Sequence, residues 1–296
     1  MTEPHIFFKV GDGDEFDPAD QISGLRYLGT DETATSPQFT NNYQDASGID
    51  GSWFISQTLA KRTFTERFWL HFSTYYDLQL AKHDLYQIFA SRQIIRVRSD
   101  HSPGKVYYGY PTPFEIAPLE GGSNDAVFSI VFDVPSGYKQ SLYRSDKMAG
   151  AQYGMNIPGG QYPSYHYTTG NFVVKNLGDL KIDPYYQSHD LKIICKYSGS
   201  SITIANQTTG ESWSYNRSND GSHTVTLDGV NTYYDGTNDT VNSDGGTISL
   251  VTGDNHISVS GANVDVTFSF PFLYLLWLQS EYLGPMVRAG TLLRRM

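Results

Sequence analysis

The stretch RTFTERFWLHF, residues 62–72, alternates between apolar and polar side chains with a period of two. Such alternation predicts a β-strand with one face turned toward a core. The apolar face carries Phe64, Phe68, Leu70 and Phe72, with Glu66 as the exception, and the polar face carries Thr63, Thr65, Arg67, Trp69 and His71. An aromatic ring on a polar strand face is a candidate contact between subunits, which makes Trp69 and its neighbour His71 candidate assembly residues.

One amphipathic helix follows this strand, over residues 74 to about 91. Its apolar residues recur at steps of three and four, and Asp77 lies in the first turn, where the helix dipole favours a carboxylate. The apolar positions are Leu78, Ala81, Leu85, Ile88 and Phe89. Further strands are predicted in IIRVRS, KVYYGYPTPFEIAP and AVFSIVFDV. A single helix among many strands predicts a β-rich α+β domain over residues 1–137.

The second half of the chain changes character twice. Residues 138–170 are rich in Gly, Tyr, Ser and Pro and have no sustained period, which predicts a connector between domains. Residues 171–272 repeat strand and turn patterns about every ten residues, which is typical of an antiparallel β-sandwich. We expect residues 273–296 to form a C-terminal tail. The fold class predicted from these patterns is mainly β.

Composition limits the partners of the chain. It has 296 residues, a formal net charge of −10, and 39% hydrophobic and 18% charged residues. This is enough apolar material for a sizeable core, and the thinly spread basic residues argue against nucleic acid or an anionic membrane as the main partner. An acidic surface would suit a channel that DNA passes without sticking. The N-terminus lacks a signal peptide, so we expect synthesis in a cytoplasm.

No pattern of catalytic or ligand-binding residues stands out. The eight histidines lack the spacing of a zinc-binding helix, and the acidic loop that begins at Asp12 lacks the calcium ligands of an EF-hand. There is no nucleophile elbow and no phosphate-binding loop. The single cysteine, Cys195, falls on an apolar strand face and is expected to be a buried thiol. We therefore predict no enzymatic activity, no catalytic residues, no cofactor and no metal.

Trp213, in the stretch ITIANQTTGESWSYN (residues 202–216), has two interpretations. Alternation with Ser212 and Ser214 places it on the apolar side of its strand, which in a sandwich faces the core. The alternative is a ring that stacks on a sugar, in which case the chain would be an adhesion module for a host cell-wall saccharide. Core packing is the favoured interpretation.

The order of these segments resembles a known family. The series is HIFFKV, ASGIDG, the strand opened by Arg62, AGAQYGMNIP, NFVVKNLGDLKIDPYYQSHDLKI, ITIANQTTGESWSYN, TGDNHISVSG and VDVTFSFPFLYL. Over essentially the whole chain, this series resembles the distal tail proteins of long-tailed, siphovirus-type bacteriophages that infect Gram-positive bacteria. No single segment is diagnostic, and the ordered set carries the resemblance.

The resemblance implies a structural protein of the virion tail tip, or baseplate. In this family six copies of the N-terminal domain close into a ring, and a galectin-like C-terminal sandwich lies outside it. The ring joins the tail tube protein to a tail-associated lysin or tail fibre hub and to receptor-binding proteins, and DNA leaves through its central channel. The expected partners are these proteins and further copies of the chain, with no sequence-specific nucleic acid and no membrane. Candidate assembly-interface residues are Phe7, Phe8, Trp69, His71 and Trp277.

Overall fold

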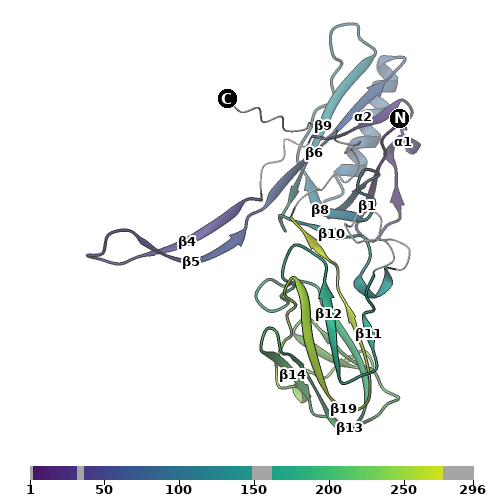
Figure 1. Ribbon diagram of the computed structural model, residues 1–296. Helices are drawn as coiled ribbons and strands as arrows, with labels where there is room; N and C mark the ends of the chain where they lie inside the picture. The colour runs from purple at the N-terminus through teal and green to yellow at the C-terminus, as the bar shows by residue number, and fades with distance from the viewer. Residues whose placement is uncertain (1–2, 32–36, 149–161, 276–296) are drawn as a thin grey trace, which may run out of the picture.

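The computed structural model describes residues 3–31, 37–148 and 162–275. It consists of two nine-stranded sheets, one after the other along the chain, and a two-stranded arm that projects from the first (Figure 1). The mainly β fold and the C-terminal β-sandwich predicted from the sequence are confirmed. Within these described ranges, no helix is long and apolar enough to cross a bilayer.

The first sheet has the strand order β2-β1-β7-β8-β9-β6-β3, and β10 and β20 are attached to it through β8. Its strands are β1 (Ile6–Val10), β2 (Glu15–Phe16), β3 (Leu25–Asp31), β6 (Arg62–His71), β7 (Ile95–Ser99), β8 (Lys105–Pro111), β9 (Asp125–Val134), β10 (Lys139–Ser141) and β20 (Leu273–Tyr274). The strand predicted at residues 62–72 is confirmed as β6, which lies between β3 and β9. We call this sheet and its helices the N-terminal unit.

Helix α2 (Tyr75–Phe89) covers the apolar side of this sheet, and α1 (Pro18–Gln21) is a single turn. A capping box fixes the start of α2, because the Thr74 hydroxyl accepts from the Asp77 N–H and the Asp77 carboxylate accepts from the Thr74 N–H. The buried face carries Leu78, Ala81, Leu85 and Phe89. The predicted helix is therefore confirmed, and its apolar stripe is what attaches it to the sheet.

Glu66, the exception in the alternation of β6, is buried among aromatic residues. Its two carboxylate oxygens accept hydrogen bonds from the hydroxyls of Tyr27 and Tyr107, each at 2.7 Å. Burial and the neighbouring Glu66 carboxylate raise the pKa of both tyrosines. The carboxylate thus has two donors in the core, which offsets the cost of removing it from water.

The second sheet has the order β11-β19-β13-β16-β17-β18, with β12 paired to β19 and with β14 and β15 paired to β13. Its strands are β11 (His166–Tyr167), β12 (Asn171–Asn176), β13 (Lys192–Asn206), β14 (Glu211–Tyr215), β15 (Asn219–Asp220), β16 (Val225–Asp228), β17 (Asn231–Tyr234), β18 (Thr237–Asn238) and β19 (Gly253–Ser269). The short 3-10 helices are η1 (Ser145–Lys147) and η2 (Thr240–Asn242).

The long strands β13 and β19 pair with each other along most of their length. Their register shifts between Lys196 and Thr203, and such bulges bend paired strands. Gly199 and Gly261 lie in this region with φ of 139° and 154°, which only glycine adopts readily. The bend lets one sheet fold over its own core and form the sandwich, which we call the C-terminal unit.

Each unit has its own core of buried residues. One core draws on residues from Ile6 to Val134, and the other on residues from Met148 to Tyr274. The predicted domain limits (1–137, 138–170, 171–272 and 273–296) stay a prediction. Within the predicted connector, β10 pairs with the first sheet and β11 with the second, so its described residues are part of both units.

Replacing Glu66 by alanine is expected to destabilise the N-terminal unit by about 3 kcal/mol, because the Tyr107 hydroxyl would lose its acceptor and the Tyr27 hydroxyl would keep only its contact with Thr30. The measurement is the midpoint of urea unfolding followed by tryptophan fluorescence. Thr63→Ala, on the exposed face of the same strand, is the control and should change stability by no more than about 0.5 kcal/mol. Equal effects of the two substitutions would contradict the role given to Glu66.

Candidate assembly surfaces

Among the described residues, no group of three or more His, Cys, Asp or Glu side chains is positioned to hold a metal ion. The sequence prediction for Cys195 agrees with the structure: the thiol is buried and donates to the Val225 carbonyl at 3.4 Å. Burial raises the pKa of the Cys195 thiol to about 12, which keeps it protonated and unreactive.

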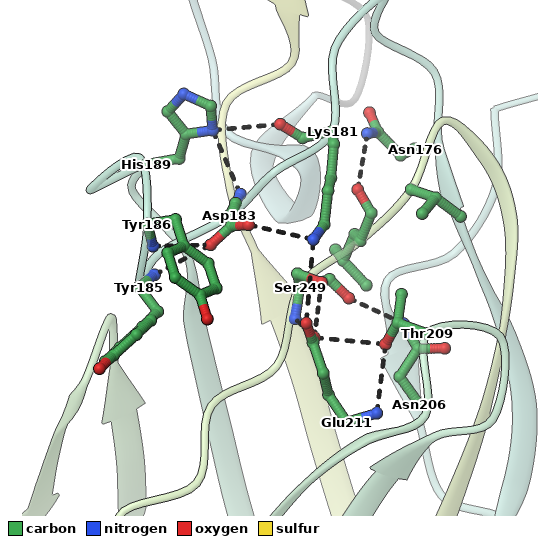
Figure 2. Close-up of polar contacts among 12 residues, drawn as sticks. Asn176, Lys181, Asp183, Tyr185, Tyr186, His189, Asn206, Thr209, Glu211 and Ser249 are labelled. Carbon is green, nitrogen blue, oxygen red and sulfur yellow. Dashed lines mark hydrogen bonds and ion pairs between the residues drawn. The ribbon is translucent and has the colours of Figure 1, made fainter. Parts of the chain in front are cut away.

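Figure 2 shows a network of polar and charged side chains in the C-terminal unit. The Lys181 ammonium lies 3.0 Å from Asp183 Oδ2 and 3.8 Å from Glu211 Oε1. Glu211 Oε2 also accepts from both the N–H and the hydroxyl of Ser249. These carboxylates already have protein donors, so the network holds loops together rather than forming a free acid–base pair.

Asp183 also fixes the loop that follows it. Its Oδ1 accepts from the backbone N–H groups of Tyr185 and Tyr186 (Figure 2). Burial alone would raise the pKa of Asp183, but these N–H groups and Lys181 hold that pKa below its ordinary value. The loop therefore presents two adjacent tyrosine rings that are 61% and 77% exposed. Sequence reasoning missed this pair, although the doublet in DPYYQSHD, after a turn-forming Asp-Pro, is a signal for it.

Trp213 is fully buried in the sandwich core. Its indole N–H donates to the Thr232 hydroxyl at 3.1 Å, and its ring lies nearly parallel to that of Tyr215. Core packing, the interpretation favoured from the alternation, agrees with this placement. A ring with no exposed surface cannot stack on a sugar, so the alternative role of Trp213 does not fit the structure.

Trp69 and His71 project from β6 on the outer side of the first sheet, away from the core. The Trp69 ring is half-buried, with the Arg26 guanidinium 5.3 Å from its centroid and the His71 ring stacked at 5.8 Å. His71 is exposed and its Nδ1 lies 2.8 Å from Asp125 Oδ1. The structure therefore brings these two candidate residues together in one half-exposed patch.

Phe7, Phe8 and Trp277 have different environments. Phe7 lies on the outer side of β1 with the Arg98 guanidinium 4.1 Å from its ring centroid, and three strands separate β1 from the β6 strand of Trp69. Phe8 is fully buried and packs edge-to-face on Phe89 of α2. Because it is the neighbour of Phe7 on a strand, it must face the core, so direct contact with another subunit does not fit Phe8. Trp277 lies outside the described residues.

The strands β4 (Phe39–Asp45) and β5 (Ser52–Leu59) form an arm that projects from the N-terminal unit (Figure 1). They pair only with each other, and nearly every residue in them is exposed. The exposed apolar side chains include Phe39, Tyr43, Trp53, Phe54 and Ile55. Sequence reasoning did not identify the arm. The run WFI, between the turn ASGIDG and a polar stretch, was the available signal.

The two faces of the arm carry different aromatic side chains. Tyr43 pairs directly with Phe54 and Phe39 pairs with Leu59, so these four side chains share one face, together with the polar pairs Asn41 with Gln57 and Asp45 with Ser52. The opposite face carries the pairs Thr40 with Thr58, Asn42 with Ser56 and Gln44 with Trp53. Ile55 is the additional residue of a β-bulge between the Asn42 and Tyr43 pairs. We call the side of Phe39, Tyr43, Phe54 and Leu59 the apolar face of the arm.

Residues 20–134 match the family model described as the phage tail protein RIFT-related domain. The matched range contains β3 to β9, α2 and the arm, and thus most of the N-terminal unit. No curated protein sequence matches the chain.

Among solved structures, the Dit (gp 19.1) protein of phage SPP1 matches with a TM-score of 0.67 and 12% identity, over 92% of this chain and 100% of that chain. That protein is presented as a paradigm of the hub adsorption apparatus in phages that infect Gram-positive bacteria. Two structures of the phage p2 baseplate in its activated conformation, with Sr and with Ca, match with TM-scores of 0.44. Their identities are 11% and 10%, over 91% and 92% of this chain and 98% of theirs. The resemblance to distal tail proteins is thus confirmed, and the SPP1 match shows a shared fold.

Replacing Trp213 by alanine is expected to destabilise the C-terminal unit by about 3–5 kcal/mol, because it leaves a cavity in a closely packed core. Trp53→Ala, in the exposed arm, should leave the unfolding midpoint almost unchanged. Differential scanning calorimetry of the two variants provides the test. A folded Trp213→Ala protein of undiminished stability would contradict the core assignment.

Proposed function

We propose that the protein is a non-enzymatic structural hub of a bacteriophage tail tip, in which six copies close into a ring through their N-terminal units. The ring would join the tail tube protein to a tail-associated lysin or fibre hub and to receptor-binding proteins. Two findings support the proposal: residues 20–134 match a phage tail protein domain, and the fold is that of the SPP1 Dit protein. The protein would be made in the cytoplasm of the host and act in the virion.

The observation that carries the proposal is the arm. A two-stranded hairpin alone is only marginally stable in water, and this one exposes several large apolar side chains. Burial of one such side chain contributes about 1.5–3 kcal/mol. The arm therefore gains most of its stability from a surface that the single copy does not provide, as expected of a subunit of an assembly.

The position of the arm favours a ring. The arm leaves the N-terminal unit on the flank opposite to α2 (Figure 1). Contacts between unlike surfaces of successive copies run head to tail, and they close into a ring when the rotation between copies allows it. A net charge of −10 suits such a ring, since a DNA chain that passes through the centre would meet little attraction. The half-exposed patch at Trp69 and His71 is a further candidate contact between copies.

The C-terminal unit would supply docking surface on the outside of the ring. The exposed tyrosines at 185 and 186 are held on a loop fixed by Asp183, and rigid exposed tyrosines are frequent in binding hot spots. We therefore propose this loop as a contact for a receptor-binding or other tail protein. The alternative function, saccharide adhesion, rested on Trp213 and loses its support with the burial of that ring.

Electron microscopy of the purified protein is expected to reveal six-fold rings with a central hole, and sedimentation velocity should give a matching mass. A turbidity assay on host cell walls should detect no lysis, because the carboxylates of the network around Lys181 already have protein donors. A monomer at all concentrations, or lysis of the walls, would contradict the proposal.

Trp69→Ala is expected to weaken association between copies without unfolding the protein, because the ring is half-exposed on the outer side of β6. Light scattering as a function of protein concentration measures the effect. Thr63→Ala, on the same side of the same strand, serves as the control. Unchanged association of Trp69→Ala would remove this patch from the interface.

A further inference from the structure

We infer that the apolar face of the arm binds, in the next copy of the chain, an apolar pocket between the C-terminal end of α2 and residues 111–114. This inference rests on the proposed function, because it names the surface that receives the arm. It goes further because it names both the segment that inserts, the arm, and the surface that receives it, the pocket. Neither includes the candidate residues Phe7, Trp69 or His71.

The pocket has a volume of about 360 Å³ and is lined by Tyr86, Phe89, Ala90, Pro111, Thr112, Pro113 and Phe114. The Phe114 ring packs edge-to-face on Tyr86 at 5.3 Å and on Phe89 at 5.8 Å. These rings are anchored in the core, so the pocket is largely preformed. No lining residue is charged, and the size is in the lower range of sites that take a small ligand or a few side chains.

The arm matches this pocket in chemistry. Its apolar face carries two aromatic rings, Tyr43 and Phe54, with centroids 6.0 Å apart, and both are more than half exposed. Insertion of such rings into an uncharged pocket removes apolar surface from water on both sides and desolvates no charge. The opposite face, with Thr, Asn, Ser and Gln side chains and the single aromatic ring of Trp53, would remain in water.

Charge distinguishes this pocket from two other hollows beside α2. Those hollows, of about 430 and 400 Å³, share Gln21, Ile22 and Asp84, and the larger one also contains Asp77. The tip of the arm is itself acidic, with Asp45 and Asp50. Like charges brought together in a closed contact are unfavourable, so the acidic hollows are poor acceptors for the arm.

Close to the apolar pocket, by contrast, the sequence carries a positively charged residue. Arg92 lies two residues beyond Ala90, is exposed, and has a φ of 58°, which is unusual for a residue with a side chain. It has no ion-pair partner among the described residues. An acidic arm tip beside Arg92 would provide such a partner, which adds charge complementarity to the apolar match.

The contact has to be between copies. In a single copy the arm extends away from the flank that carries α2 (Figure 1). Among the described residues, the arm thus has no acceptor and the pocket no occupant within one copy, and the two lie on opposite flanks. This is the arrangement that a head-to-tail ring requires.

Four single variants test the inference. Phe54→Ser changes the apolar face of the arm, and Trp53→Ser changes the opposite face at almost equal exposure, 59% against 60%. Ala90→Trp fills the mouth of the pocket from an exposed position, and Gln87→Trp does the same in an acidic hollow. None of these substitutions removes a core side chain, so all four proteins should fold, which circular dichroism and the unfolding midpoint will verify.

Sedimentation velocity of the full chain should give at least about a tenfold weaker association for Phe54→Ser and Ala90→Trp, which corresponds to the loss of one good interface contact. Trp53→Ser and Gln87→Trp should stay within about twofold of the original protein. Asp50→Lys and Arg92→Glu should each weaken association, and the double variant should recover it. Recovery by the exchanged pair cannot come from a folding defect.

The outcomes separate this inference from the proposed function. Rings that form normally from Phe54→Ser and Ala90→Trp would overturn the arm-to-pocket contact and leave the ring itself in place. In that case, loss of binding to a purified tail tube protein by Phe54→Ser would assign the arm to that partner. An equal effect of Trp53→Ser, or a larger effect of Gln87→Trp, would overturn the choice of face or pocket. A chain that never associates would overturn the proposed function.

Discussion

The architecture depends on a short three-strand ladder between the two units. Strand β10 pairs with β8 of the first sheet and, on its other edge, with β20, which follows the last long strand of the sandwich. The chain therefore leaves the first sheet through β10, directly beside β20, the strand by which it returns to that sheet. Two chain crossings joined by backbone hydrogen bonds resist rotation between the units far better than one linker would. Docking surfaces on the sandwich consequently have a defined orientation relative to the first sheet.

Side chains reinforce this ladder. The Lys105 ammonium lies 4.3 Å from the centroid of the Tyr274 ring, and the Arg62 guanidinium donates to the Leu275 carbonyl at 2.9 Å. Burial lowers the pKa of Lys105. A cation over an aromatic face is worth more when water is excluded, and an arginine that caps a free carbonyl satisfies the end of a strand. Both contacts cross from strands of the first sheet to residues 274 and 275, so they add side-chain contacts to the backbone pairing at the junction.

Sequence patterns predicted those strands and helices in which the spacing of apolar residues indicates the buried face. The alternation of β6 gave its buried face, the spacing of Leu78 and Leu85 gave α2, and the flanking serines turned Trp213 inward. The sequence could not predict β10 and β20, because strands of three and two residues have too few positions to display a period. It also could not give the arm, whose apolar side chains are unburied in the single copy. Phe8 was assigned to an interface because a doublet of phenylalanines does not reveal which ring faces the core.

The arm and the junction impose complementary requirements on the protein. A rigid junction between the two units fixes the orientation of the sandwich in an assembly only if the contacts between copies are also well defined. With variable contacts, the orientation of the sandwich would differ from one copy to the next. In the proposed ring, an arm and a pocket on opposite flanks would remove that freedom, because each copy would be held by two neighbours. The contact that closes such a ring would form between surfaces already held near each other, so its effective concentration would be high and little further translational entropy would be lost. Closed rings would then be favoured over open chains, and burial of the apolar side chains that the arm exposes in a single copy would drive the assembly.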